Sequence, residues 1–258
     1  MKDYGLVSVI TPSYNSACFI KETIESILSQ TYTNWELLIT DDCSTDNTEI
    51  IVKEYTQKDD RIKFFKLEKN SGAGVARNKS ISEAKGRFIA FCDSDDYWYP
   101  DKLEKQLTFM EKENSTFSFT SYNVCSEKGT FKGQILAPKK ANFFNLICDD
   151  CIGCLTAMYN AEKLGKFFMP TIRKRQDWGL WLNIIQKSEL AHGMTECLAC
   201  YRLRTQSLSA NKFSLVKYNV NVYKQVLNYP TYKAYLTFLF LFMPSYTLKK
   251  IKNRIHNI

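Results

Sequence analysis

Short apolar runs alternate with helix-spaced segments over the first 120 residues. Apolar side chains recur three or four positions apart in residues 19–28, as a helix with one buried face requires. Two further helices are predicted over 46–55 and 74–84. The runs that predict strands are 6–10, 35–39, 62–65 and 88–91. Asp46 and Glu49 have the spacing of a capping box for the second helix. This alternation predicts an α/β fold: a mostly parallel central sheet with helices on both faces.

The pattern is less regular after residue 112. Strands are predicted at 117–122 and 196–202, helices at 143–148 and 178–186, and a polar loop at 128–140.

Near the C-terminus, residues 235–243 form an apolar run that is too short to cross a bilayer, which needs about 20 residues. A basic cluster follows at Lys249, Lys250, Lys252 and Arg254. An apolar face beside basic residues is typical of a helix lying on an anionic membrane surface. The alternative is a helix that packs on the core and ends in solvated lysines.

Composition sharpens this division of the chain. The 258 residues, 45% of them apolar, suit one large α/β domain or two small ones. The net charge is +8, yet every basic residue in excess lies after Glu196, where no acidic residue occurs. We therefore predict a domain over residues 1–212 and a basic, apolar helical tail over 213–258, whose charge favours an anionic partner.

The nine cysteines, an odd number, mostly have apolar neighbours, which favours buried thiols in a reducing compartment. The spacing of Cys148, Cys151 and Cys154, together with Cys197 and Cys200, is compatible with a zinc site. We disfavour it, because residues 197–200 read as a strand, in which positions i and i+3 face opposite sides. The N-terminus also lacks the charged-then-apolar pattern of a signal peptide.

The chemistry is concentrated after the strand predicted at 88–91, where Asp93, Asp95 and Asp96 place three carboxylates in four positions. Carboxylates this close repel and raise each other's pKa unless a cation lies among them. Mg²⁺ and Mn²⁺ prefer such oxygens and commonly hold phosphates. The cluster therefore predicts a metal that presents a phosphorylated ligand; an Asp-rich turn before a helix near Pro100 is the alternative.

Two further polar segments, 11–14 and 41–42, also follow predicted strands. In a parallel sheet, ligands bind beyond the carboxyl ends of the strands, so the three segments predict one site. His192 and His256 lie far from the acidic cluster in the sequence, which disfavours serine–histidine chemistry.

Six ordered segments carry a resemblance to a known family. They are Val7–Asn15, Glu36–Asp46, Asn70–Asn78, Phe91–Asp96, Gln176–Leu182 and Tyr201–Ser209. Together they resemble the family 2 glycosyltransferases of GT-A (Rossmann-like) fold, over roughly residues 5–212. The resemblance implies an inverting enzyme of bacterial surface-polysaccharide type that uses a nucleotide-sugar donor.

The resemblance also implies roles for the donor side. Thr11, Pro12 and Tyr14 would hold the uracil ring, and Asp42 would accept its N3–H, with Asp41 closing the turn. Cys43 stands where the family often has glycine, so we expect no positive φ there. Arg77 would lie near the base or pyrophosphate, and Asp93 and Ser94 near the ribose. Asp95 would bind Mn²⁺ or Mg²⁺, with Asp93 as a second ligand and Asp96 as a turn residue.

On the acceptor side, Asp177 matches the catalytic base, although a carboxylate at a helix start can also be a simple cap. Gln176 stands at the first position of a frequent Glu-Asp pair, and Trp178 could stack on an acceptor sugar. Arg202 and Arg204 would contact phosphate or acceptor. Many relatives have histidine where Arg204 stands, and arginine cannot bind a metal.

These expectations define a hexosyltransferase that moves galactose, glucose or an N-acetyl form from a UDP-sugar to a lipid-pyrophosphate-linked saccharide in O-antigen or capsule assembly. It would be a peripheral protein on the cytoplasmic face of the membrane, with no nucleic-acid partner. A sugar nucleotidylyltransferase is the first alternative, but residues 11–14 lack its Gly-rich basic loop. A non-catalytic protein that binds membrane or nucleic acid is the second, and the carboxylates at 93, 95 and 177 speak against it.

Overall fold

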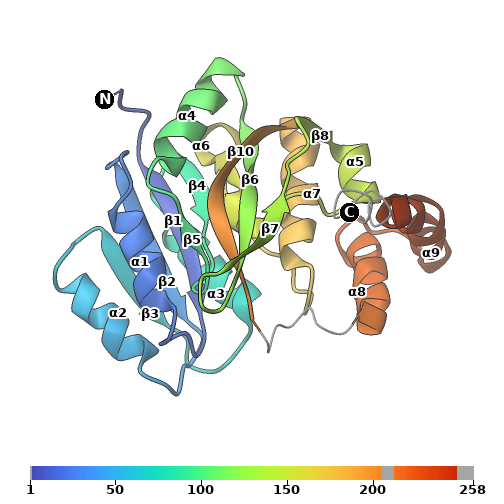
Figure 1. The fold of residues 1–258 in the computed structure, drawn as a ribbon. Helices are drawn as coiled ribbons and strands as arrows, with labels where there is room; N and C mark the ends of the chain where they lie inside the picture. The colour runs from blue at the N-terminus through green and yellow to red at the C-terminus, as the bar shows by residue number, and fades with distance from the viewer. Residues whose placement is uncertain (1, 205–211, 249–258) are drawn as a thin grey trace.

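The computed structural model describes residues 2–204 and 212–248, and it centres on one sheet (Figure 1). The strand order is β3-β2-β1-β4-β9-β6-β10-β5, with β7 paired to β6 and β8 to β10. The first four strands are parallel: β1 (Val7–Ser13), β2 (Trp35–Asp41), β3 (Ile62–Lys66) and β4 (Phe88–Phe91). Val9 of β1 is opposite Leu37 on one side and Ala90 on the other. The predicted parallel sheet is thus confirmed for this half.

The second half of the sheet is mixed. Its strands are β5 (Tyr97–Trp98), β6 (Phe117–Ser126), β7 (Phe131–Ile135), β8 (Lys140–Asn142), β9 (Met158–Asn160) and β10 (Leu190–Leu203). β9 is antiparallel to both β4 and β6, whereas β6 and β10 are parallel. The prediction of a loop at 128–140 is wrong, because β7 forms within it. It is an edge strand with mostly solvent-facing side chains, so it lacks the apolar signal of a buried strand.

Helices cover both faces of the sheet, as predicted. They are α1 (Ile20–Leu28), α2 (Thr48–Thr56), α3 (Ala73–Glu83), α4 (Lys102–Lys112), α5 (Phe143–Cys148), α6 (Ala161–Leu164), α7 (Gln176–Ser188), the short η1 (Cys154–Thr156), and the C-terminal α8 (Lys212–Gln225), α9 (Thr231–Thr237) and η2 (Phe238–Phe242). Successive strand side chains point to opposite faces, so Val9 joins the core beneath α1 and α4, and Ile10 the core beneath α3 and α7.

The predicted capping box is wrong. The helix begins at Thr48, so Glu49 lies too early to reach back to the cap. Its carboxylate instead pairs with Lys53 and Lys66. Asp46 accepts the backbone N–H of Thr48 at 3.0 Å and that of Ala17 at 3.0 Å, which ties α2 to the segment before α1.

The C-terminal helices share the core of the sheet domain. Figure 1 places α8 and α9 on the side of the sheet domain that carries α5 and α7, with α9 outermost. Val220, Tyr223, Phe238 and Phe242 are buried in the same apolar cluster as Trp178 of α7. None of the helices that the structure describes is long and apolar enough to span a bilayer. The boundary at residue 212 stays a prediction, and the basic cluster after residue 248 lies outside the described residues.

Lys102 is the least expected member of the core beneath α4, because its side chain is fully buried. Its ammonium donates to Gln106 Oε1 at 2.6 Å and lies 4.0 Å from the centre of the Trp98 ring. Burial lowers the pKa of Lys102 to about 7. The unfolded chain, with an ordinary lysine pKa, therefore binds more protons above pH 7 than the folded protein does.

This difference makes a pH-dependent prediction for Lys102→Met, which keeps the volume and removes the charge. The penalty for burying the lysine is fully present below pH 7 and disappears as the pH rises toward 10.5. The wild type should gain about 2 kcal/mol of unfolding free energy relative to the variant between pH 7 and pH 9. Urea titrations of both proteins at the two pH values measure this, and parallel changes would contradict the buried-lysine assignment.

Candidate active site

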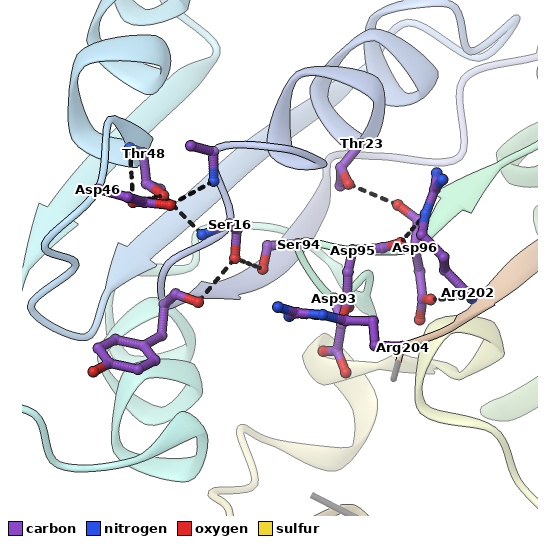
Figure 2. Close-up of polar contacts among 12 residues, drawn as sticks. Ser16, Thr23, Asp46, Thr48, Asp93, Ser94, Asp95, Asp96, Arg202 and Arg204 are labelled. Carbon is purple, nitrogen blue, oxygen red and sulfur yellow. Dashed lines mark hydrogen bonds and ion pairs between the residues drawn. The ribbon is translucent and has the colours of Figure 1, made fainter. Parts of the chain in front are cut away.

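The polar segments that follow β1, β2 and β4 meet at one edge of the sheet, as predicted. The Asp42 amide donates to Ser13 O at 2.8 Å, which joins the ends of β2 and β1. The Ser16 and Ser94 hydroxyls lie 2.7 Å apart and join the segment after β1 to that after β4 (Figure 2). The strand register thus brings these three loops into one site.

The end of β1 offers two kinds of group. The hydroxyls of Thr11 and Ser13 are buried and have no hydrogen-bond partner within the described residues. Pro12 is buried within β1, whereas Tyr14 is 47% exposed. Tyr14 is therefore open for stacking on a flat ligand, as predicted for uracil, and that contact stays a prediction.

Asp42 holds a loop together. Its two carboxylate oxygens accept the backbone N–H groups of Ser71 at 2.6 Å and Gly72 at 2.7 Å, just before α3. The uracil contact of Asp42 stays a prediction that must use the remaining lone pairs of these oxygens. Asp41 accepts the Ser44 amide at 2.8 Å and closes the turn, as expected.

Cys43 overturns an expectation. It adopts φ +61° in the same left-handed region that favours glycine. Its Sγ lies 2.8 Å from Leu67 O, and the Asp41–Ser44 contact fixes the turn around it. The surrounding hydrogen bonds therefore impose the conformation despite the side chain.

Arg77 and Asp93 form a close ion pair. One terminal nitrogen of Arg77 contacts the two Asp93 oxygens at 2.6 and 2.8 Å, and the residue is only 8% exposed. Burial lowers the pKa of Arg77, but Asp93 and Asp177 are among the groups that raise it overall. The pair joins α3 to the acidic cluster at the end of β4. The negative charge of the predicted base, Asp177, also raises the pKa of Arg77.

Asp96 and Arg202 build the turn that carries the acidic cluster. Asp96 is almost fully buried, and burial followed by the charges of Asp95 and Asp93 raises its pKa well above the usual range. Its carboxylate accepts the Arg202 amide at 2.9 Å, and its carbonyl accepts the Thr23 hydroxyl at 2.7 Å (Figure 2). Asp96 is thus a structural turn residue, in line with the sequence interpretation.

The contacts of Arg202 correct its predicted role. Its guanidinium donates to Asp95 O at 2.9 Å, Glu127 O at 2.8 Å and Glu22 Oε2 at 2.5 Å, and lies over the Phe19 ring. A side chain that is 4% exposed and bound in this way is not available to a phosphate or acceptor. Arg202 instead supports the backbone beneath Asp95.

Asp93 and Asp95 are the two carboxylates of the acidic cluster whose side chains remain partly exposed. Burial and the charge of Asp93 raise the pKa of Asp95, while Arg204, 3.3 Å from its Oδ2, lowers it. No group of three or more His, Cys, Asp and Glu side chains in the described residues makes a metal site alone. Two hard oxygen donors fit Mg²⁺ or Mn²⁺ whose other ligands come from phosphates and water.

The predicted base, Asp177, lies in the first turn of α7. Its Oδ1 accepts the amide of the next residue, Trp178, at 2.9 Å, whereas the N-cap position is Arg175 and its side chain makes no capping hydrogen bond. The preceding Arg175 has φ +64° and is held by Asp150 at 2.9 Å and Asn219 of α8 at 3.0 Å. The turn that carries Asp177 is therefore braced from two sides.

Gln176 and Trp178, the neighbours of Asp177, have different environments. Gln176 packs over Gly74 of α3: a Cβ built on that glycine would lie 2.5 Å from Gln176 Nε2. Trp178 is fully buried, donates to Leu146 O at 2.7 Å and packs on Tyr223 and Phe242. The prediction that Trp178 stacks on an acceptor sugar is thus wrong, because its apolar helix spacing reflects the core.

Sequence reasoning missed three residues of this site. Ser16 and Thr23 hold the acidic loop through Ser94 and the Asp96 carbonyl. Cys154 of η1 is close enough to Asp93, Arg77 and Asp177 for their charges to affect its pKa, which burial raises. No local pattern marks the serine and threonine, and the cysteine stood out only through its spacing to other cysteines.

The mixed sheet and its covering helices have GT-A architecture. Staphylococcus aureus TarS, solved with UDP-GlcNAc, superposes with a TM-score of 0.72 over 90% of this chain and 70% of its own, at 23% identity. Pyrobaculum calidifontis mannosyltransferase PcManGT, solved with GDP-Man and Mn²⁺, gives 0.66 over 89% and 66%, at 18% identity. At these identities the likeness shows the fold.

Sequence comparison then gives the family. Glycosyl transferase family 2 matches residues 8–165, and the chain belongs to that family. It is 44% identical to TuaG of Bacillus subtilis (strain 168), named for a glycosyltransferase role in teichuronic acid biosynthesis, over 97% of this chain and 98% of that protein. It is 40% identical to the Escherichia coli UDP-Glc:α-D-GlcNAc-diphosphoundecaprenol β-1,3-glucosyltransferase WfgD, over 91% of both chains. The protein is a hexosyltransferase.

The role of Arg202 in supporting the acidic loop can be tested with Arg202→Lys. A lysine keeps the charge but cannot reach the three oxygens that the guanidinium fork contacts. Leaving the part-buried carbonyls of Asp95 and Glu127 unpaired should cost about 2–4 kcal/mol of unfolding free energy, measured in urea. The exposed Arg173→Lys is the matched control, and equal stability of the two variants would refute the support role.

Proposed function

We propose that this protein transfers a hexose from a UDP-sugar to a hydroxyl of a lipid-diphosphate-linked saccharide, with inversion, in O-antigen, capsule or related surface-polysaccharide assembly. The observation that carries the proposal is the meeting of Tyr14, Asp93, Asp95 and Arg77 at one sheet edge, with Asp177 near enough to influence Arg77. The relatives add support for the substrate class, because WfgD is named for UDP-Glc and a diphosphoundecaprenol-linked sugar.

On the donor side, the exposed Tyr14 would stack on uracil, and Thr11, Ser94 and Asp42 would supply polar contacts to the nucleoside. Asp95 and Asp93 would hold Mn²⁺ or Mg²⁺, which offsets diphosphate charge and stabilises the leaving UDP when bound. Arg77 keeps Asp93 oriented through contacts of 2.6 and 2.8 Å. The preorganised charges make departure of the diphosphate easier.

On the acceptor side, Asp177 acts as the general base. It takes the proton of the acceptor hydroxyl while that oxygen bonds to the anomeric carbon, and the bond from this carbon to the diphosphate oxygen breaks. Displacement from the opposite face inverts the centre, so an α-linked donor gives a β-linkage. Gln176, packed against Gly74, borders this position and is the proposed acceptor contact.

Two substitutions separate these roles. Asp177→Asn should lower kcat for UDP release about 100-fold or more and leave the Kd for UDP unchanged, because it removes the base alone. Asp95→Ala should weaken UDP binding in the presence of Mn²⁺. Turnover is measured with UDP-glucose and a lipid-diphosphate N-acetylglucosamine acceptor.

The exposed Asp60→Asn is the control for the loss of one carboxylate and should behave like the wild type. Near-normal turnover of Asp177→Asn would remove Asp177 from the base role. Loss of activity in both aspartate variants with UDP still bound by Asp177→Asn supports the assignment.

A second proposal concerns the location: the C-terminal helices lie on an anionic membrane surface at its cytoplasmic face. Phe238 and Phe242 bury one side of the α9–η2 segment against the core. Large apolar residues of this segment and of the six residues after it are exposed, namely Tyr232, Tyr235, Leu236, Leu239, Phe240, Met243, Tyr246 and Leu248. Exposed aromatic and aliphatic side chains next to a lysine-rich sequence suit the headgroup region of such a membrane. A lipid-linked acceptor would then be close to the site.

This location predicts that the full chain pellets with vesicles containing phosphatidylglycerol, and less so at high salt. Leu239→Gln combined with Phe240→Gln should abolish most of the pelleting, because it removes apolar side chains that do not pack on the core. The matched control is Phe131→Gln with Leu136→Gln, two residues of similar exposure in and next to β7. Equal pelleting of the two double variants would refute the membrane surface.

A further inference from the structure

A cation already lies on the proposed metal ligand. Arg204 directly follows β10, and its Nη1 is 3.3 Å from Asp95 Oδ2. Its guanidinium carbon is 5.2 Å from the centre of the Phe19 ring. Figure 2 shows the guanidinium beside Asp93 and Asp95. Any divalent metal that binds Asp95 therefore meets a positive charge at the same carboxylate.

The three arginines around the acidic cluster are held very differently. Arg77 contacts both oxygens of Asp93 at 2.6 and 2.8 Å, and its side chain is 10% exposed. Arg202 has three oxygen partners within 2.9 Å. The side chain of Arg204 is 31% exposed, and its contact with Asp95 is longer than the 2.7–2.9 Å of a strong charged hydrogen bond. Arg204 is therefore the arginine that can leave the cluster at least cost.

We propose that Arg204 competes with the divalent metal for Asp95 in the nucleotide-free enzyme, and moves onto the donor diphosphate when metal and nucleotide bind. The inference rests on the proposed donor and metal site. Two cations at one carboxylate repel each other. A diphosphate instead offers several anionic oxygens, and the planar guanidinium can contact two of them at once.

The consequence is a conditional affinity. Without nucleotide, metal binding must displace Arg204; with nucleotide, the displaced guanidinium gains a new partner. Thermodynamic linkage then requires that metal and UDP each increase the affinity for the other. Arg204 thus makes tight metal binding depend on the presence of the donor.

Arg204→Gln tests this, with Mn²⁺ binding followed by the EPR signal of the free ion and UDP binding by calorimetry. Without UDP, the variant should bind Mn²⁺ about fivefold more tightly than the wild type, because the competing charge is gone. With Mn²⁺ present, it should bind UDP about tenfold more weakly, because the guanidinium contact is lost. Arg204→Lys keeps the charge and should retain Mn²⁺ binding close to that of the wild type.

The matched control is Arg87→Gln, which removes an arginine paired with Glu162 just before β4, at the opposite end of that strand from the cluster. It should change neither affinity. Unchanged or weaker Mn²⁺ binding by Arg204→Gln without UDP would overturn the competition. Failure of the wild type to bind Mn²⁺ even with UDP would instead overturn the proposed metal site and the competition with it.

Discussion

The burial of like charges at the end of β4 is the constraint around which this site is organised. Asp93, Asp95 and Asp96 lie together at the edge of a closely packed sheet, and burial raises the pKa of Asp95 and Asp96. Each of the three carboxylates has a different partner. Asp93 receives the guanidinium of Arg77, Asp96 receives a backbone N–H, and Asp95 keeps a weakly held arginine. This graded arrangement leaves one carboxylate whose cation can be exchanged.

Much of the fold could be predicted because its first half follows simple periodic rules. The strand at 88–91 and the helix at 143–148 were predicted with the bounds that the structure shows. The edge strand β7 could not be, since its exposed side chains resemble those of a loop. The left-handed turn at Cys43 was missed because contacts distant in the sequence, including one to Leu67, impose it.

The site shows a similar division. Motif positions located the loops correctly, because the carboxyl ends of parallel strands must share one edge of the sheet. The motif positions could not predict which side chains are accessible to a ligand and which are buried. Arg202 ends the predicted strand and Arg204 lies two residues further on, yet Arg202 is buried beneath the acidic loop and Arg204 contacts its surface. Trp178 likewise lies within a family motif, yet its side chain is fully buried in the core.

The contact between Arg175 and Asn219 joins the turn before Asp177 to helix α8. Asn219 is itself buried, and the guanidinium of Arg175 is held by both Asn219 and Asp150 while its backbone adopts the unfavourable left-handed conformation. Helix α8 is therefore a component of the active-site scaffold as well as the start of the tail. If the C-terminal helices were exchanged between relatives, residues 150, 175 and 219 would have to be exchanged together. Otherwise the turn that positions Asp177 would lose its contacts.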